Sequence, residues 1–166
     1  SKVNIAGAQI STGTIITLVV GALIMAALTL FVGRTRTGRA MQAVSEDRGA
    51  AQLMGINVNR IIMITFAIGS ALAAFASLFY LMQIPSTSPT LGAMPGIKAF
   101  TAAVIGGIGS IPGAMVGGVL LGLIEKICLS VPAISAYTTA IEFSLLIIIL
   151  LVKPIGILGK KRRVKV

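Results

Sequence analysis

The chain has 166 residues, of which 56% are hydrophobic and only 11% charged, and its mean hydropathy is +1.02. Soluble domains carry about 25% charged residues. A water-soluble fold of this size cannot hide so much apolar surface, so the composition excludes a soluble protein. The net charge of +10 does not indicate nucleic-acid binding, because the basic residues flank apolar runs and aromatic side chains for base stacking are scarce.

Cysteine and histidine usage excludes several kinds of site. Cys128 is the single cysteine and there is no histidine, so an internal disulfide, a Cys/His metal site and a Ser–His or Cys–His catalytic pair are impossible. The four acids do not indicate a hydrolase pair. We therefore expect no catalytic residue, no metal and no cofactor, and we expect that the chain is not an enzyme.

The chain starts at Ser1 without a methionine, and residues 1–12 lack the basic region and short apolar core of a signal peptide. We therefore expect a C-terminal portion of a longer membrane protein.

Apolar stretches of about 20 residues predict helices that span a bilayer. Two uncharged stretches, residues 14–32 and 61–84, fit one span each, and a last span covers residues 135–152. A further apolar region, residues 99–128, is interrupted in its middle. The predicted fold class is all-α integral membrane: a polytopic helical bundle with an interrupted segment, in one transmembrane domain over residues 1–166.

Glycine and proline interrupt the region 99–128. Lipid cannot satisfy backbone groups that a broken helix leaves free, so such a break must be buried in protein or line a water-filled cavity. Transporters often build their pathways from interrupted helices. The candidate path residues are Gly106, Gly107, Gly109, Ser110, Pro112 and Gly113.

The basic residues predict the orientation, because cytoplasmic loops carry an excess of lysine and arginine. Residues 34–60 and 153–166 together hold eleven of the fourteen basic residues. We therefore expect this loop and this tail in the cytoplasm and the N-terminal residues outside. The region 99–128 must then enter and leave on the outer face. A re-entrant pair that turns near residues 109–112 is favoured because the first arm, residues 99–108, is short; two full spans are the alternative.

The cytoplasmic loop contains helix signals. Ser45 followed by Glu46 and Asp47 resembles an N-cap with acids in the first turn. Residues 48–54 continue as a helix with an apolar side that includes Ala50 and Ala51, and Gly55 suits a left-handed stop. Such a helix suits docking onto a soluble partner, and a solvated connector is the alternative.

Glu142 is the one acid deep within a predicted span. An ionisable group in a membrane is costly, so a functional role is the default hypothesis. Glu142 also lies near the outer end, where Lys126 or water can pair with it. A structural pair and a role in a pathway both stay open.

Three motifs carry a resemblance to a known family: GINVNR at residues 55–60, KAFTAAVIGGIGSIPGA at 98–114 and PIGILG at 154–159. Over nearly its whole length the chain resembles the LivH-type membrane subunit of high-affinity branched-chain amino acid ABC importers, corresponding to the C-terminal half or so of such a permease. The resemblance implies a multi-pass protein of the prokaryotic plasma (inner) membrane, embedded in the lipid bilayer, that moves leucine, isoleucine or valine inward.

The resemblance also implies partners: two cytoplasmic ABC ATPase subunits, a paralogous permease subunit and an external substrate-binding protein. The chain has no P-loop, so ATP is hydrolysed on other subunits. Such importers present a helix to an ATPase where this chain has Ser45, Glu46, Asp47, Arg48, Ala50, Ala51 and Gly55. Two other functions stay open: a permease of the same superfamily for urea, short amides or a sugar, and a non-transporting membrane fragment.

Overall fold

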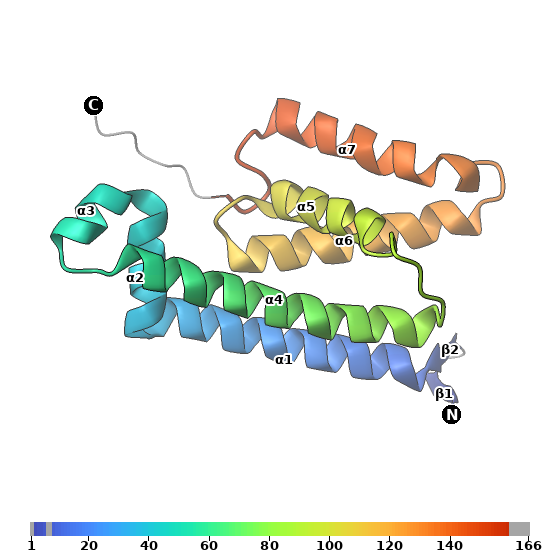
Figure 1. Cartoon of the computed structure of the whole chain (residues 1–166). Helices are drawn as coiled ribbons and strands as arrows, with labels where there is room; N and C mark the ends of the chain where they lie inside the picture. Colours follow the sequence, from blue (N-terminus) through green and yellow to red (C-terminus); the bar gives the residue numbers. More distant parts are fainter. Residues whose placement is uncertain (1, 6–7, 160–166) are drawn as a thin grey trace. The chain divides into compact units, whose positions relative to one another are not determined.

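Helices make up most of the chain in the computed structural model, which describes residues 2–5 and 8–159 (Figure 1). The chain divides into two units, Ser1–Thr87 and Ser88–Val166, and each is described on its own. Among the described residues, four helical stretches are long and apolar enough to cross a membrane: Thr12–Arg34, Val58–Gln83, Ile111–Ser130 and Ser135–Val152. The predicted all-α, polytopic membrane class is confirmed. The single transmembrane domain over residues 1–166 stays a prediction.

The first unit begins with a short antiparallel hairpin of β1 (Lys2–Ile5) and β2 (Ala8–Ser11), which the sequence analysis did not predict. Then follow α1 (Thr12–Arg34), α2 (Arg36–Glu46), α3 (Arg48–Leu53) and α4 (Val58–Gln83). The apolar surfaces of α1 and α4 are almost entirely unburied within the chain, as lipid-facing or partner-facing helices must be. The spans predicted at 14–32 and 61–84 correspond to α1 and α4.

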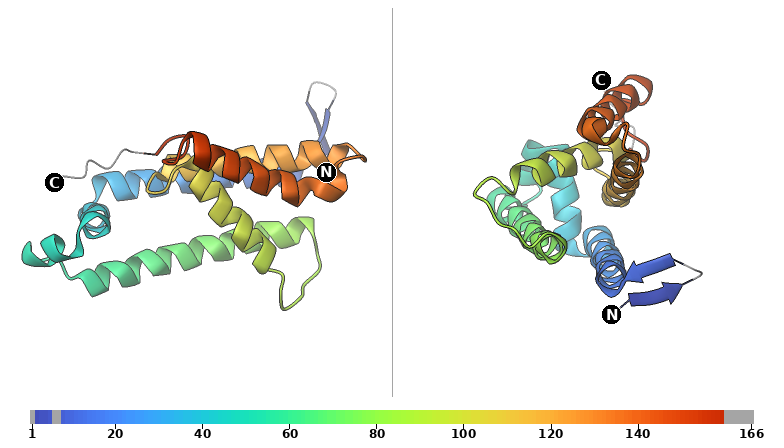
Figure 2. Two further views of the ribbon diagram at one scale, coloured as in Figure 1. Left: turned by 90° about the horizontal axis from the view of Figure 1, so that it is seen from above. Right: turned by 90° about the vertical axis from the view of Figure 1, so that its right-hand side faces the viewer.

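The short helices α2 and α3 join the ends of α1 and α4 (Figure 2). A sharp corner separates α1 from α2, and the hydroxyl of Thr35 both donates to the carbonyl of Phe31 and accepts from the N–H of Gly38. Gly38 is buried there, and a Cβ would overlap the carbonyl oxygens of Phe31 and Val32. The small core of this unit comprises Val44, Ala51, Val58 and Ile61.

The second unit contains α5 (Ala93–Gly106), α6 (Ile111–Ser130), the 3-10 turn η1 (Ser135–Tyr137) and α7 (Thr138–Val152). Its apolar core joins Ala102, Ile105 and Leu121 with leucine and isoleucine side chains of α7. The predicted interruption of residues 99–128 lies between α5 and α6. Figure 2 shows α5 leaning away from α6 toward the N-terminal end of α5.

The predicted tail, residues 153–166, is described as far as Gly159, and residues 160–166 lie outside the described residues.

Candidate functional site

The segment predicted to be cytoplasmic contains two helices, α2 and α3, joined at Asp47. One carboxylate oxygen of Asp47 accepts the N–H groups of Gly49 and Ala50, at 2.8 and 3.1 Å, and so caps α3. The predicted N-cap at Ser45 is wrong. Ser45 and Glu46 form the last turn of α2, where the Ser45 hydroxyl donates to the carbonyl of Gln42. Asp47 takes the capping role because its backbone is extended and its carboxylate reaches two free amides.

The predicted stop at Gly55 is confirmed. Gly55 has φ +82°, its N–H bonds to the carbonyl of Gln52, and the N–H of Ile56 bonds to the carbonyl of Ala51. This pair of bonds is the Schellman arrangement that ends many helices. Asn57 then caps α4 by accepting the N–H of Arg60 at 3.2 Å.

The short helix α3 presents different residues on its two sides. Ala51 is 2% exposed and packs in the core of the first unit, whereas Leu53 and Met54 are 91% and 83% exposed. The expectation that Ala51 lies on a docking side is therefore wrong, because Ala51 faces the core with Val44 and Val58. Ala50 and Arg48 are exposed. The large apolar side chains that this helix exposes to another protein are Leu53 and Met54.

Glycines bring the ends of α5 and α6 into backbone contact. A Cβ at Gly106 would overlap the carbonyl of Gly113, and one at Gly113 would overlap the carbonyl of Gly106. One turn further along, Gly117 lies against the carbonyl of Ala102. Small residues permit this close approach of two membrane helices. Gly106 and Gly113 are thus helix-packing residues in this unit.

The turn itself, residues 107–110, uses two glycines and a cap. Gly107 has φ +110° and Gly109 φ +89°, conformations that a side chain disfavours. The Ser110 hydroxyl accepts the N–H of Gly113 at 3.2 Å and caps α6, with Pro112 in the first turn. Gly109 is exposed and a Cβ there meets nothing within 4 Å.

The segment after α7 completes the hydrogen bonding of the broken region. The N–H groups of Ile157 and Leu158 donate to the carbonyls of Ile105 and Gly106, at 2.9 and 3.0 Å. These carbonyls lie in the last turn of α5, where no helical donor remains. The free carbonyls at the break are thus hydrogen-bonded by protein and not left to lipid. Their donors lie about fifty residues later in the sequence.

Tight packing locks this segment against the turn. Gly107 lies against the backbone of Ile155 and Gly159, and Gly156, at φ +81°, lies against Gly107. A pocket of about 410 Å³ is lined by residues of the segment 152–159. The PIGILG motif is therefore the partner of the GGIG turn, and the two motifs form one feature.

Of the six predicted path residues, Gly106, Gly107 and Gly113 are buried, Ser110 is partly buried, and Gly109 and Pro112 are exposed. The structure brings all six together around one turn. Ile108, at 75% exposure, projects at its tip. Their role in a path stays a prediction.

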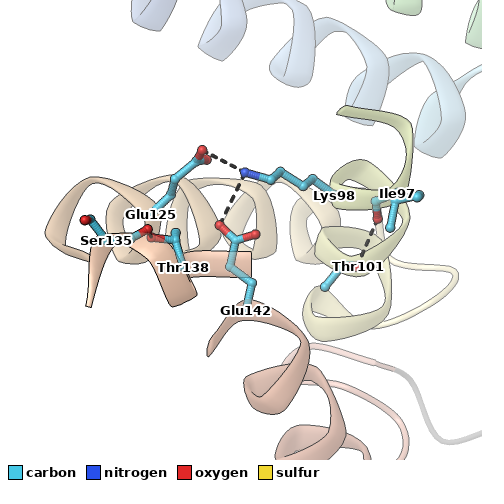
Figure 3. A network of polar contacts seen from close by, with 7 residues as sticks. All are labelled: Ile97, Lys98, Thr101, Glu125, Ser135, Thr138 and Glu142. Atoms are coloured by element: carbon cyan, nitrogen blue, oxygen red, sulfur yellow. Dashed lines mark hydrogen bonds and ion pairs between the residues drawn. The ribbon is translucent and has the colours of Figure 1, made fainter. Parts of the chain in front are cut away.

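Glu142 meets two other charged residues (Figure 3). Lys98 Nζ on α5 lies 2.7 Å from Glu125 Oε1 on α6 and 3.5 Å from Glu142 Oε1 on α7. The expected pairing with Lys126 is wrong, because Lys126 is exposed whereas Lys98 reaches inward between the helices. Sequence reasoning missed Lys98 and Glu125 as partners. The signal available was that each is a charge within an apolar helix.

Comparison with known proteins identifies the class. The family model described as branched-chain amino acid transport system / permease component matches residues 1–151. The chain belongs to this family of membrane permease components. The predicted resemblance is confirmed, and the family with the four apolar helical stretches identifies a multi-pass protein of the prokaryotic plasma membrane.

Individual relatives are more specific. The chain is 50% identical over 160 residues to the high-affinity branched-chain amino acid transport system permease protein BraD of Pseudomonas aeruginosa, covering 96% of this chain and 52% of BraD. It is 46% identical over 159 residues to LivH of Escherichia coli, covering 96% and 51%. The fructose import permease protein FrcC of Rhizobium meliloti is 36% identical over 112 residues, covering 64% and 31%. No solved structure matches the chain.

The chain thus spans about half the length of the branched-chain amino acid permeases BraD and LivH.

Proposed function

We propose that the protein is a membrane-spanning permease subunit of an ABC importer that moves leucine, isoleucine and valine into the cell. The observation that carries this proposal is the 50% identity to BraD along 96% of the chain. ATP is hydrolysed by two separate cytoplasmic ATPase subunits, and an external binding protein delivers the substrate. A paralogous permease subunit supplies the rest of the pathway.

A sugar is the second candidate substrate, because a fructose permease matches 64% of the chain at 36% identity. The identity to BraD is higher and extends over more of the chain, which favours amino acids. The deciding measurement uses the full-length permease, assembled with its ATPases, paralogue and binding protein in proteoliposomes. We expect ATP-driven uptake of labelled leucine. Uptake of fructose or urea without leucine would contradict the substrate, and no uptake of any solute would favour a non-transporting membrane protein.

Coupling to the ATPases depends in this proposal on the segment 45–55, with Leu53 and Met54 as the contact. Both side chains are almost fully exposed, and they are held in place by the Asp47 cap before α3 and the Gly55 turn after it. Two exposed apolar side chains held on a short cytoplasmic helix suit an apolar groove on a soluble partner. Movement of the partner then moves α3 together with the core that it shares with α4.

We expect Leu53→Asp to abolish ATP-driven uptake while leaving the amount of folded permease unchanged, because this side chain touches little within the chain. Ala51→Arg is the contrasting variant: it places a charge in the core and reduces the amount of folded protein. Normal uptake by Leu53→Asp would contradict the proposed contact.

The turn at 107–110 has a proposed place at the cytoplasmic face. The carbonyls of Ile105 and Gly106, just before the turn, accept the N–H groups of Ile157 and Leu158. These two donors follow α7 and precede the basic tail, which the charge distribution predicts to be cytoplasmic. At 1.5 Å per residue, α6 is about 30 Å long and α5 about 21 Å. The hairpin therefore enters from outside and reaches the inner side, which makes it deeper than a shallow re-entrant loop.

The path role proposed for this turn follows from that position. Ile108 and Gly109 project at the inner end of the hairpin, where a small movement of the tip opens or closes an exit. The buried glycines hold the two helices and the tail around it. We expect a cysteine at Ser110 to react with a membrane-impermeant thiol reagent only from the inside and one at Ser88 only from the outside. Reaction of Ser110→Cys from outside alone would contradict this depth.

A further inference from the structure

Three charged side chains from three different helices meet in the second unit, toward the end where α5 leans away from α6 (Figure 3). Lys98 spans the space between α5 and the other two helices, and its ammonium lies between the carboxylates of Glu125 and Glu142. Only Lys98–Glu125 has hydrogen-bond geometry, at 2.7 Å. Glu142, at 3.5 Å, is an ion-pair neighbour without a hydrogen bond.

The cluster is unbalanced in charge. Two carboxylates share one ammonium, and the Glu142 side chain is only 4% exposed. Its Oε1 atom has no hydrogen-bond partner. The two nearby buried hydroxyls donate elsewhere: Thr138 to the carbonyl of Ser135 and Thr101 to that of Ile97. A buried carboxylate that lacks donors is costly, above all within a membrane.

The arrangement around Lys98 already accommodates a primary ammonium. Lys98 and Glu125 are about a third exposed, at 30% and 34%, so the cluster has one open side. A second ammonium that enters there supplies the donor that Glu142 lacks. Lys98 then stays hydrogen-bonded to Glu125, as it is now. Hydrogen bonds to a charged partner are the strong class in proteins.

We propose that Lys98, Glu125 and Glu142 form a transit site for the primary ammonium group of the transported solute, with Glu142 as the acceptor. This inference rests on the proposed function, and it deepens it by naming the chemical group that the membrane subunit recognises. An amino acid satisfies the site with its α-ammonium. A sugar or urea has no cationic group to offer it.

The test uses the assembled full-length transporter in proteoliposomes and measures leucine uptake, binding-protein-stimulated ATP hydrolysis and thermal stability. Glu142→Gln keeps the shape of the side chain and removes its charge. Because a hydrogen bond to a charged group is worth about 1.5–3 kcal/mol, we expect uptake to fall at least about tenfold. Stability does not fall, stimulated ATP hydrolysis stays unchanged, and Glu142→Asp retains part of the uptake. Lys126→Gln, an exposed residue of α6, is the matched control and transports normally.

A purely structural ion cluster is distinguished by the neutral triple variant Lys98→Met, Glu125→Gln, Glu142→Gln. Replacing every charge relieves the burial cost, so a structural cluster regains both stability and uptake in this variant. The proposed site predicts a stable triple variant that does not transport leucine. Normal leucine uptake by the triple variant, or by Glu142→Gln alone, would overturn the proposal.

The wild-type transporter separates a failure of this inference from a failure of the proposed function. If it carries another solute with a primary ammonium, the branched-chain substrates are wrong, and the same variants test the site with that solute. If it carries only solutes without a cationic group, both proposals fail.

Discussion

The turn after α3 and the turn between α5 and α6 both rely on glycine with positive φ, yet they differ in surroundings. Gly55 has φ +82° and nothing within 4 Å of a Cβ position. Gly107 has φ +110° and lies against the backbone of Ile155 and Gly159. The first turn needs glycine for its conformation alone, whereas the second needs it for conformation and for space. A glycine in a sequence motif therefore does not reveal which of these it supplies.

The largest effect is expected at the helix contact. Gly106→Ala places a Cβ on the carbonyl of Gly113, and neither backbone can yield without separating α5 from α6. We expect a loss of at least about 3 kcal/mol in unfolding free energy, the upper end for overpacking. The measurement is thermal unfolding of the purified full-length permease. Gly118→Ala, on α6 with nothing within 4 Å, is the control and is neutral or slightly stabilising. Equal effects of the two variants would contradict the close contact.

A smaller effect is expected at Gly156, which shares its φ with Gly55 but has less space around its Cβ position. Gly156 and Gly55 have φ +81° and +82°, but a Cβ at Gly156 would lie against Gly107. Both alanine variants lose about 1–2 kcal/mol for the left-handed conformation. Only Gly156→Ala adds overlap with the turn, so we expect it to lower the melting temperature further. If both variants melt alike, the packing of the tail against the turn contributes nothing.

The N-caps of α3 and α6 give a smaller effect. Asp47 accepts two amides of α3, whereas Ser110 accepts one of α6. Asp47→Ala is expected to cost about 1 kcal/mol or slightly more, and Ser110→Ala less. Because α3 has six residues, its loss is local, and amide hydrogen exchange over residues 48–53 measures it better than global melting. Unchanged exchange in Asp47→Ala would contradict the capping role.

The smallest effect is expected at Pro112, which lies in the first turn of α6, where a missing N–H removes no helical bond. Pro112 is exposed at the surface of the chain. We therefore expect Pro112→Ala to change the unfolding free energy by less than about 0.5 kcal/mol. A loss comparable to that of Gly106→Ala would show that proline, and not the glycine contact, defines the turn.

Local patterns predicted the elements well. Apolar runs located α1, α4 and α7 to within a few residues, and glycine with proline located the break after α5. The left-handed stop at Gly55 followed from its place after a short apolar run. These features depend on residues adjacent in sequence, so a single chain contains the information.

Pairings between distant residues were not predicted. The partner of Glu142 was expected at Lys126 or in water, and it is Lys98. Backbone groups make the bonds from Ile157 and Leu158 to the end of α5. Every residue except proline has the same backbone donor, so the residue types do not indicate this pairing. The cap at Ser45 was wrong for a local reason: serine and aspartate both suit the role, and only the backbone conformation at Asp47 selects between them.

The bonds from the segment after α7 to α5 have a consequence for biosynthesis. When α5 is translated and inserted, the carbonyls of Ile105 and Gly106 have no protein donor, because Ile157 and Leu158 have not yet been made. During that interval, water or the insertion machinery must supply hydrogen-bond donors to these carbonyls. Insertion of the hairpin is therefore completed by the last part of the described chain, and a stop codon after α7 removes donors that an otherwise intact hairpin requires.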